Sequence, residues 1–231
     1  MDKIDYRRHY VLVLDTETAN TFRNGKQLDT SNALVYDCGW SVVDTKGNVY
    51  LERSFVNRDI FVYQREVMRT AYYANKIPLY VADLRTGKRK MASTYEIKKQ
   101  LWDDIKKYRI KEVAAHNARF DYNALNTTQR YTSKSKYRYW FPAGIEIWDT
   151  MRMARDVILK MPTYRKFCEE HDLFTPTGRL PCTAETLYRF IIKDPYFVES
   201  HTGLEDVQIE REILFYCLRQ HKPMRKKLWN N

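Results

Sequence analysis

The sequence has no long hydrophobic run. It has 231 residues and a mean hydropathy of −0.65, and no apolar stretch approaches the roughly 18 residues that cross a bilayer. The apolar run Tyr10–Leu14 is shorter than the core of a secretory signal, and no small-residue cleavage site follows it. We therefore expect a soluble, cytoplasmic protein with no membrane partner.

Cysteines and linkers are also scarce. The four cysteines lie far apart, form no CxxC pair and have no histidine at zinc-finger spacing. We therefore expect reduced, partly buried thiols rather than a zinc site or a disulfide framework. No segment is rich enough in proline, glycine or serine to separate two domains. With 44% hydrophobic and 30% charged residues, the composition predicts one globular domain over residues 1–231.

Positive charge is in excess. Lysine and arginine number 40 against 29 acidic residues, for a net charge of +11, which favours a polyanionic partner such as nucleic acid. The excess gathers in residues 76–111, in residues 128–142 and in a basic tail, 222–231. In the second segment, Lys134, Lys136 and Arg138 alternate with aromatic residues. This pattern predicts contacts to the phosphates and bases of a strand, and the alternative is an ordinary solvated loop.

Hydrophobic periodicity predicts an α/β fold with a mixed sheet flanked by helices. The expected strands are 10–15, 33–43, 48–55, 77–81, 90–92, 112–115 and 145–148, with 77–81 and 90–92 paired as a hairpin. The expected helices are 58–74, 93–109, 119–128, one from 150, 164–171, 184–192 and 204–221, and residues 19–32 are expected to be a loop. Ser93 and Glu96 form the capping box that opens the second helix. Ligand groups should gather at strand ends and helix starts.

Three short motifs place carboxylates at such positions. Asp15 and Glu17 end the first strand in the motif DTET and, being two residues apart, point to the same side of an extended chain. Asp121 lies in the first turn of a helix, in HNARFD. Asp206 opens the last helix, in HTGLED, five residues after His201. Taken singly, the motifs have plain alternatives, namely chance, helix capping and an exposed histidine.

Together the motifs predict a metal site. If Asp15, Glu17, Asp121 and Asp206 converge, they cannot all stay ionised without cations. Oxygen ligands select Mg²⁺ or Mn²⁺ over zinc. Two such ions roughly 4 Å apart clamp the attacking and leaving oxygens in phosphodiester hydrolysis. His201, which titrates near neutrality, is the candidate general base.

The motifs resemble those of the DnaQ-like exonucleases, in the DEDDh branch of the DEDD superfamily. Asp15 and Glu17 match the first motif of that family, and His116–Asp121 match its HNxxFD-type second motif. His201 and Asp206 match the HxxxxD motif of the histidine branch. The resemblance implies an RNase H-like fold, 3′→5′ exonuclease activity with release of nucleoside 5′-monophosphates, and two divalent ions. It implies that Asp15, Glu17, Asp121 and Asp206 bind these ions and that His201 is the base.

The resemblance also implies substrate contacts. Thr16 and Thr18 are expected to contact the terminal nucleotide. Asn117 and Phe120 are expected to line its pocket, although Phe120 could equally belong to the core. Asn117 is also the expected N-cap of the helix at 119–128, and Asp149 is expected to cap a helix rather than to bind metal.

The chain departs from the family pattern in several places. Ala19 and Gly203 stand where glycine and alanine are usual, and Val207 stands where alanine is common. The stretch 58–92 is longer than the compact family core needs, so we expect it to be an insertion. Glu205, beside Asp206, is expected to point away from the metal site.

Three functions are open at this point. The first is a DNA 3′→5′ exonuclease acting on single-stranded or frayed 3′ ends in proofreading or in phage-like replication and repair, alone or with a polymerase. An exoribonuclease of the same family would use the same metal ligands, and no residue can be assigned to a 2′-hydroxyl contact. The third is a non-catalytic single-strand-binding module, which the presence of all five catalytic positions opposes.

Overall fold

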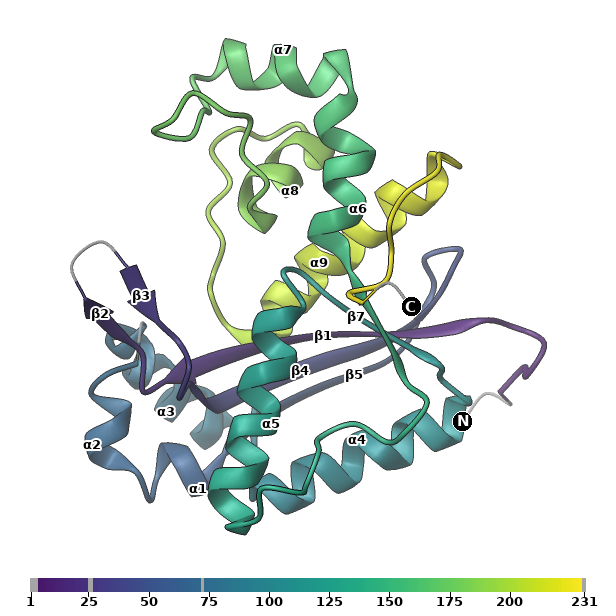
Figure 1. Cartoon of the computed structure of the whole chain (residues 1–231). Coiled ribbons are helices and arrows are strands. Elements are labelled where there is room, and N and C mark those ends of the chain that lie inside the picture. The colour runs from purple at the N-terminus through teal and green to yellow at the C-terminus, as the bar shows by residue number, and fades with distance from the viewer. Residues whose placement is uncertain (1–3, 25–26, 72, 230–231) are drawn as a thin grey trace.

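A six-stranded mixed sheet organises the chain in the computed structural model, which describes residues 4–24, 27–71 and 73–229 (Figure 1). The strands of this sheet are β1 (Tyr10–Ala19), β4 (Leu34–Asp44), β5 (Val49–Asn57), β6 (Lys90–Ala92), β7 (Glu112–Ala115) and β8 (Glu146–Asp149). Their order is β6-β5-β4-β1-β7-β8. The pairs β1–β4 and β4–β5 are antiparallel, whereas β1–β7, β7–β8 and β5–β6 are parallel. A separate ribbon joins β2 (Phe22–Asn24) and β3 (Gln27–Asp29).

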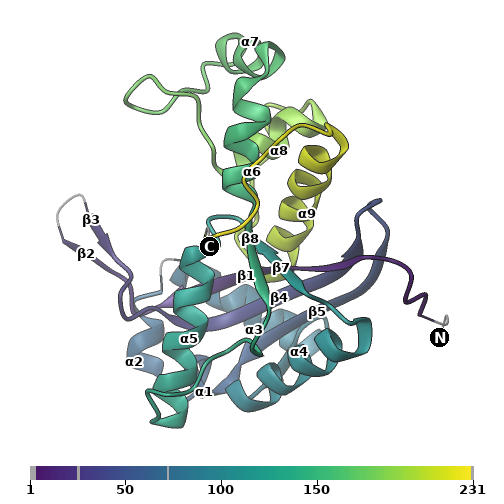
Figure 2. The same ribbon diagram turned by 45° about the vertical axis from the view of Figure 1, so that its right-hand side comes forward.

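Helices cover both faces of the sheet (Figures 1 and 2). They are α1 (Arg58–Phe61), α2 (Arg65–Met68), α3 (Ile77–Thr86), α4 (Thr94–Tyr108), α5 (Arg119–Ser133), α6 (Thr150–Asp156), α7 (Pro162–Glu170), α8 (Ala184–Ile192) and α9 (Gly203–Arg219), with 3-10 turns at Ala74–Lys76 and Ile158–Lys160. Helices α6, α7 and α8 and their connections, residues 150–192, stand together above the sheet in Figure 1, and we call them the lobe. None of the described helices is long and apolar enough to span a membrane.

Alternation along β1 builds two core layers. Leu12 and Leu14 belong to a buried cluster that includes Leu101 of α4 and Leu125 of α5. The intervening residues of β1 point to the other face. There, Val11 and Val13 join a second cluster with residues of α9 and the lobe. The ends of β1, α5 and α9 are thereby fixed around one strand.

The order of strands and helices confirms the predicted α/β fold with a mixed sheet. The strands expected at 10–15, 33–43, 48–55, 90–92, 112–115 and 145–148 are all present within a few residues. The capping box is also present, since Ser93 accepts from the backbone N–H of Glu96 and the Glu96 side chain accepts from that of Ser93. The early antiparallel pairs and the later helical crossovers follow the expected order.

Three expectations for residues 19–92 are wrong. Residues 77–81 belong to α3, which has Pro78 in its first turn and ends at Gly87 with φ 75°. Strand β6 therefore pairs with β5, in parallel, instead of with 77–81. The helix expected over 58–74 is divided into α1, α2 and a 3-10 turn. These turns seat Ile60 and Met68 against Tyr80 in a third buried cluster. The expected loop at 19–32 contains the β2–β3 ribbon.

The basic tail lies along β8. The backbone N–H of Asp149 donates to the carbonyl of Lys226 at 2.7 Å, and that of Leu228 donates to the carbonyl of Ile147 at 2.8 Å. Lys227 forms an antiparallel bridge with Trp148. The described part of the tail thus extends the sheet edge, and residues 230–231 lie outside the described residues.

Candidate active site

The three acidic motifs meet around β1. Asp15 and Glu17 lie on this strand, Asp121 lies in the first turn of α5, and Asp206 lies in the first turn of α9. The hydroxyl of Thr16 donates to Oδ1 of Asp121 at 2.7 Å. This buried hydrogen bond ties the start of α5 to β1, so Thr16 orients one of the predicted ligands.

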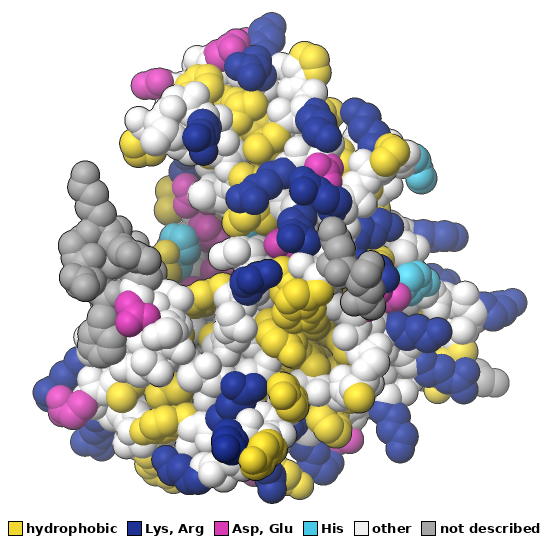
Figure 3. All heavy atoms as spheres, viewed as in Figure 1, with side chains coloured by type: hydrophobic (Ala, Val, Ile, Leu, Met, Phe, Trp, Pro, Cys, Tyr) yellow, Lys and Arg dark blue, Asp and Glu magenta, His cyan; other side chains and the backbone are white. Residues whose placement is uncertain are grey.

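Glu17, His201 and Asp206 form a tight group. Each offers one ligand atom, and these atoms all lie within 4.8 Å of one another. Oδ2 of Asp15 and Oδ1 of Asp206 are buried and have no hydrogen-bond partner in the part of the chain that the structure describes. In Figure 3, acidic side chains and a histidine lie in the hollow between the lobe and the sheet. Buried oxygens without donors are the atoms that a cation would satisfy.

Burial and mutual repulsion disfavour the ionised forms of these carboxylates. Burial and the nearby Glu210 raise the pKa of Asp15 well above its ordinary value, and burial and Asp206 do the same for Glu17. Burial raises the pKa of Asp121 to about 7. Burial and a neighbouring carboxylate raise the pKa of Asp206 to about 8. Several negative charges in one buried space need compensating cations, and an all-carboxylate oxygen set fits hard divalent ions.

Two glycines bring α9 onto the sheet beside Asp15. Gly39 pairs with Asp15 in the β1–β4 register, and a Cβ on Gly39 would lie 2.5 Å from the carbonyl carbon of Gly203. A Cβ on Gly203 would lie 3.0 Å from the backbone nitrogen of Gly39 and 3.2 Å from Oδ2 of Asp37. The departure from the family pattern at position 203 therefore has a steric reason. The same crossing places Asp206 over β1.

A fifth carboxylate, that of Glu210, was not predicted from the sequence. It lies one turn after Asp206 on α9, is buried, and accepts the backbone N–H of His116 at 3.0 Å. Burial and Asp121 raise the pKa of Glu210 well above its ordinary value. The available signal was the four-residue spacing from Asp206, which puts both side chains on one helix face. Glu210 thus links the third motif to the second.

His201 is held by residues of the 58–92 segment. Its backbone has φ 51°, in the left-handed region, and its ring stacks on that of Tyr73 with 4.3 Å between centroids. Lys76 donates to the backbone carbonyl of Ser200. Oε2 of Glu199 lies 3.7 Å from Nδ1 of His201. Burial and the charge of Lys76 lower the pKa of His201, so its imidazole is neutral at pH 7 and can accept a proton.

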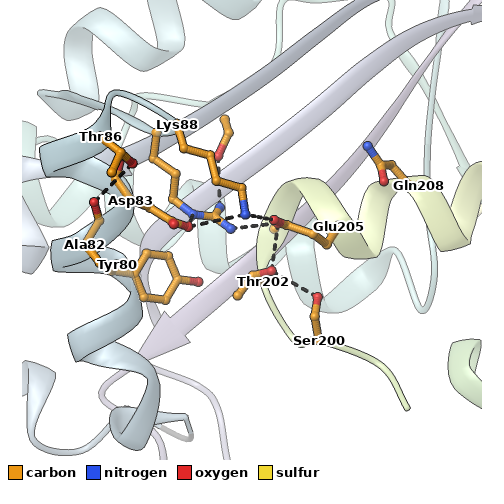
Figure 4. Close-up of polar contacts among 12 residues, drawn as sticks. Tyr80, Ala82, Asp83, Thr86, Lys88, Ser200, Thr202, Glu205 and Gln208 are labelled. Atoms are coloured by element: carbon orange, nitrogen blue, oxygen red, sulfur yellow. Dashed lines mark hydrogen bonds and ion pairs between the residues drawn. The ribbon is translucent and has the colours of Figure 1, made fainter. Parts of the chain in front are cut away.

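Arg89 connects the same segment to the start of α9. Its guanidinium lies 3.2 Å from Oδ2 of Asp37, 3.0 Å from Oδ2 of Asp83 and 2.7 Å from Oε2 of Glu205. Asp37 Oδ2 in turn accepts the backbone N–H of Gly203 at 2.9 Å. Figure 4 shows Asp83 and Lys88 reaching from the α3 side toward Glu205 on α9. The members of this network are far apart in the chain, so no sequence pattern predicts it.

The carboxylate of Glu205 is hydrogen-bonded and ion-paired within this network. Burial alone would raise its pKa, but hydrogen bonds from Thr202, Lys88 and Arg89 lower the pKa of Glu205 to about 2. Its carboxylate is therefore ionised and fully engaged at neutral pH, and α9 offers Asp206 rather than Glu205 to the group around Glu17.

Both ring nitrogens of His116, in the second motif, are hydrogen-bonded within the protein. Its Nε2 donates to the backbone carbonyl of Cys182 at 2.8 Å, and its Nδ1 is hydrogen-bonded to the hydroxyl of Thr150 at 2.9 Å. Burial lowers the pKa of His116. The ring thus joins the turn before α5 to the lobe and does not belong to the group around His201.

The expectation that Asn117 caps α5 is wrong. The N-cap is Ala118, which makes no side-chain cap hydrogen bond. Asn117 instead adopts φ 61°, which many residues avoid and asparagine tolerates, and its backbone N–H donates to Oδ1 of Asp149 at 3.1 Å. Oδ1 of Asp149 also accepts the backbone N–H of Met151 at 3.0 Å, so Asp149 caps α6 as expected.

The predicted substrate contacts lie in two places, one near the start of α5 and one beyond its end. Thr18 is buried on β1, Asn117 is exposed, and Phe120 is half-buried against the core while lining a hollow of about 220 Å³. Lys134 and Lys136 are exposed beyond the far end of α5. The helical rise puts Lys134 about 20 Å from the level of Asp121.

The basic run beyond α5 is therefore not brought to the carboxylates. Arg138 is exposed as well, and the ammonium of Lys134 lies over the Tyr131 ring, 4.4 Å from its centroid. Trp140, which alternates with the cations in the sequence, is buried in the core and is not available to stack on a base.

Comparisons with known proteins identify the fold. No protein-family model and no curated protein sequence matches the chain. A full-length 3′-exonuclease crystal structure aligns with a TM-score of 0.57 and 11% identity, over 95% of this chain and 85% of that one. The nuclease domain of 3′hExo, a DEDDh family member bound to rAMP, aligns with a TM-score of 0.52 and 12% identity, over 95% and 96%.

A larger protein shares the same fold. The zinc-bound complex of E. coli ExoI with single-stranded DNA aligns with a TM-score of 0.52 and 12% identity, over 94% of this chain but only 41% of that chain. The chain therefore has the RNase H-like fold of these exonuclease structures, as the motif resemblance implied.

Proposed function

We propose that the protein is a metal-dependent 3′→5′ exonuclease that hydrolyses phosphodiester bonds at the 3′ end of single-stranded DNA and releases nucleoside 5′-monophosphates. The observation that carries this proposal is the convergence of carboxylates from β1, α5 and α9 with one imidazole. The proposal rests on this site, because one fold can carry many functions, and the similarity in fold to solved exonucleases is consistent with it.

Two divalent ions, Mg²⁺ or Mn²⁺, fit the proposed site. Asp15, Glu17, Asp121 and Asp206 would hold them, and the buried, unpartnered oxygens of Asp15 and Asp206 support this role. Bound there, the ions would polarise the phosphodiester and stabilise the charge that develops on the attacking and leaving oxygens. Thr16, by its hydrogen bond to Asp121, positions one ligand before any ion arrives.

His201 acts as the general base in this proposal. Its lowered pKa leaves the ring neutral at pH 7, so it can take a proton from the attacking water. Glu199 lies 3.7 Å from Nδ1 and stabilises the resulting imidazolium when it is ionised, and burial and Glu185 raise the pKa of Glu199 to about 7. Tyr73 holds the plane of the ring by stacking on it, and a fixed orientation matters because proton transfer requires hydrogen-bond geometry.

Substrate recognition is proposed at both ends of α5. The residues that would contact the terminal nucleotide are Thr16, Thr18, Asn117 and Phe120. Lys134, Lys136 and Arg138 would contact phosphates several nucleotides away, since α5 separates them from the carboxylates by about 20 Å. We place the activity in cytoplasmic DNA replication or repair, alone or with a polymerase.

A second candidate is an exoribonuclease of the same fold. The observation that favours it is the similarity to the nuclease domain of 3′hExo, which was crystallised with rAMP. The similarity to an ExoI complex with single-stranded DNA favours DNA. A non-catalytic strand-binding module is disfavoured, since every proposed ligand and the base are present.

Digestion of matched single-stranded DNA and RNA, labelled at the 5′ end, decides between these functions. With Mg²⁺ we expect DNA to shorten from its 3′ end and EDTA to stop the reaction. Asp206→Asn should reduce the rate by several orders of magnitude, whereas Asp103→Asn, an exposed acid on α4, should not change it. Faster digestion of RNA would establish the second candidate, and tight binding without product would establish the third.

A further inference from the structure

The lobe carries a basic hollow of about 820 Å³ between α6, α7 and the segment before α8. Its lining includes Arg155, Arg165, Arg179 and Phe174, and contains no aspartate or glutamate. We propose that this hollow binds the sugar-phosphate backbone of the substrate strand, upstream of the 3′ end that enters the active site. This inference rests on the proposed function, because it assigns a path to the same substrate.

In the part of the chain that the structure describes, the three arginines have no acidic partner, and a guanidinium nitrogen of Arg155 donates to Sδ of Met151 at 3.1 Å. Among the described residues, no carboxylate oxygen lies within 4.0 Å of a guanidinium nitrogen of Arg155, Arg165 or Arg179, and all three are exposed. Arg53 and Arg225, by contrast, are each bound to an aspartate. Arginine presents a planar fork of donors that matches phosphate oxygens, and three forks around one hollow suit successive phosphates of a strand.

An aromatic ring and an ordered turn complete the hollow. Phe174 has 36% of its surface exposed at the edge of the arginines. The turn that follows it is closed by hydrogen bonds from the backbone N–H of Thr175 to the carbonyl of Arg179, at 2.9 Å, and from that of Gly178 to the carbonyl of Thr175, at 2.8 Å. A base can stack on an exposed ring while the neighbouring cations bind its phosphate. These features favour a single strand over an isolated phosphate.

The hollow adjoins the candidate active site. Cys182 lines it, and the carbonyl of the same residue accepts a hydrogen bond from His116 in the motif that carries Asp121. The charge of Arg155 also acts on His116, since it helps to lower the pKa of that ring after burial. In Figure 3, Lys and Arg side chains surround apolar side chains on the lobe, above the hollow that contains the acidic side chains. A strand can therefore pass from the lobe to the carboxylates.

The test combines binding with two substrates of different length. The triple variant Arg155→Gln, Arg165→Gln, Arg179→Gln is compared with the wild type and with Lys46→Gln, Lys106→Gln, Lys111→Gln, which removes the same charge from exposed positions on the far end of the sheet and α4. Anisotropy of a labelled 20-mer in EDTA measures affinity against salt. Hydrolysis of the 20-mer and of thymidine 5′-p-nitrophenyl phosphate, too short to reach the lobe, measures turnover.

We expect the arginine variant to bind the 20-mer about tenfold more weakly than the wild type. The slope of log K against log salt should be less steep by about 2, since each phosphate contact on a single strand contributes about 0.7. Its turnover of the short ester should equal that of the wild type. An affinity and a salt slope equal to those of the lysine control would overturn the inference. A second result would also overturn it. If the wild type bound thymidine 5′-monophosphate as tightly as the 20-mer, and the arginine variant did not, the hollow would be a mononucleotide site.

The outcomes also separate this inference from the proposed function. If the wild type hydrolyses neither substrate, the exonuclease proposal fails while the binding comparison still tests the hollow. If the triple variant does not fold, Arg179→Gln and Phe174→Ala, both at exposed positions of one turn, replace it. Each should then weaken 20-mer binding by about threefold, and an unchanged affinity in both contradicts the inference.

Discussion

The ring of Tyr73 stacks on the imidazole of His201, with 4.3 Å between the centroids and 12° between the planes. Tyr73 belongs to the 58–92 segment, and His201 belongs to the turn that opens α9. The same segment contacts that turn through Lys76, at the carbonyl of Ser200, and through Arg89, at Glu205. The 58–92 segment therefore holds the residue proposed as the general base.

Tyr73→Ala should lower kcat about tenfold and leave KM nearly unchanged. Without the stacked ring, His201 samples orientations that cannot accept the proton of the attacking water, and general-base catalysis loses efficiency. Steady-state kinetics on a short oligonucleotide measures both constants. Tyr73→Phe should retain most of the activity, because it keeps the ring. Tyr63→Ala is the matched control, because Tyr63 is 65% exposed. An equal loss of kcat in this control contradicts the positioning role.

Arg89→Ala should destabilise the protein by about 3–5 kcal/mol, because it leaves Asp37 buried and unpaired. The side chain of Arg89 is only 2% exposed, and its guanidinium bridges two buried acids and Glu205. Urea unfolding followed by tryptophan fluorescence measures the loss. Arg85→Ala removes an exposed arginine from the same segment and should change the free energy of unfolding by less than about 0.5 kcal/mol. Equal stability of the two variants would show that the network does not hold α9.

The metal-free protein should lose stability as the pH rises from 5 to 8. Asp121 and Asp206 have pKa values of about 7 and about 8 in the folded state, against an ordinary value of 3.8. The folded state therefore binds more protons than the unfolded state over this window, so raising the pH favours unfolding. Added Mg²⁺ compensates the ionised carboxylates, and its stabilising effect should grow with pH. Thermal unfolding in EDTA and in Mg²⁺, at both pH values, measures this.

The variant Asp206→Asn separates the effect of the carboxylates on the pH dependence of stability from that of the histidines. The lowered pKa values of His116 and His201 act in the opposite sense, because the folded state then holds fewer protons on these rings than the unfolded state. Asp206→Asn keeps both histidines and removes one raised carboxylate, so it should flatten the fall in stability and reduce the response to Mg²⁺. A steeper fall in the variant than in the wild type contradicts the assignment.

Glu210→Gln should weaken Mg²⁺ activation and raise the stability of the metal-free protein at pH 8. The amide oxygen of glutamine can still accept the backbone N–H of His116, so the substitution removes charge and keeps the hydrogen bond. Loss of a negative charge near Asp15 reduces the attraction for a cation. The Mg²⁺ concentration that gives half-maximal activity measures the effect. A half-maximal concentration equal to that of the wild type would show that Glu210 acts only through His116.

The sequence predicts the candidate metal ligands better than it predicts the residues that hold them in place. Strand ends and helix starts can be located from hydrophobic periodicity and capping, so Asp15, Asp121 and Asp206 could be placed near one another before any coordinates. Glu210 was missed, although its spacing from Asp206 put it on the same helix face. Arg89 could not have been found, because its partners on β4, α3 and α9 are brought together only by the fold.

The errors in secondary structure have a common origin. Residues 77–81 are apolar enough for either a short strand or a helix, and periodicity does not separate the two over five positions. Tertiary contacts decided the outcome, since Tyr80 in α3 donates its hydroxyl to Asp37 at 2.7 Å. Asn117 has the right residue type for an N-cap, but its left-handed backbone aims its N–H at Asp149 instead.

Calorimetric titration of Mn²⁺ into the wild type and Asp15→Asn tests whether these carboxylates bind metal. If carboxylates from β1, α5 and α9 jointly hold a pair of hard ions, the wild type should bind two Mn²⁺ per chain, and the variant should lose at least one of them. Absence of binding by the wild type, or identical isotherms for the two proteins, would show that these carboxylates do not form the proposed metal site.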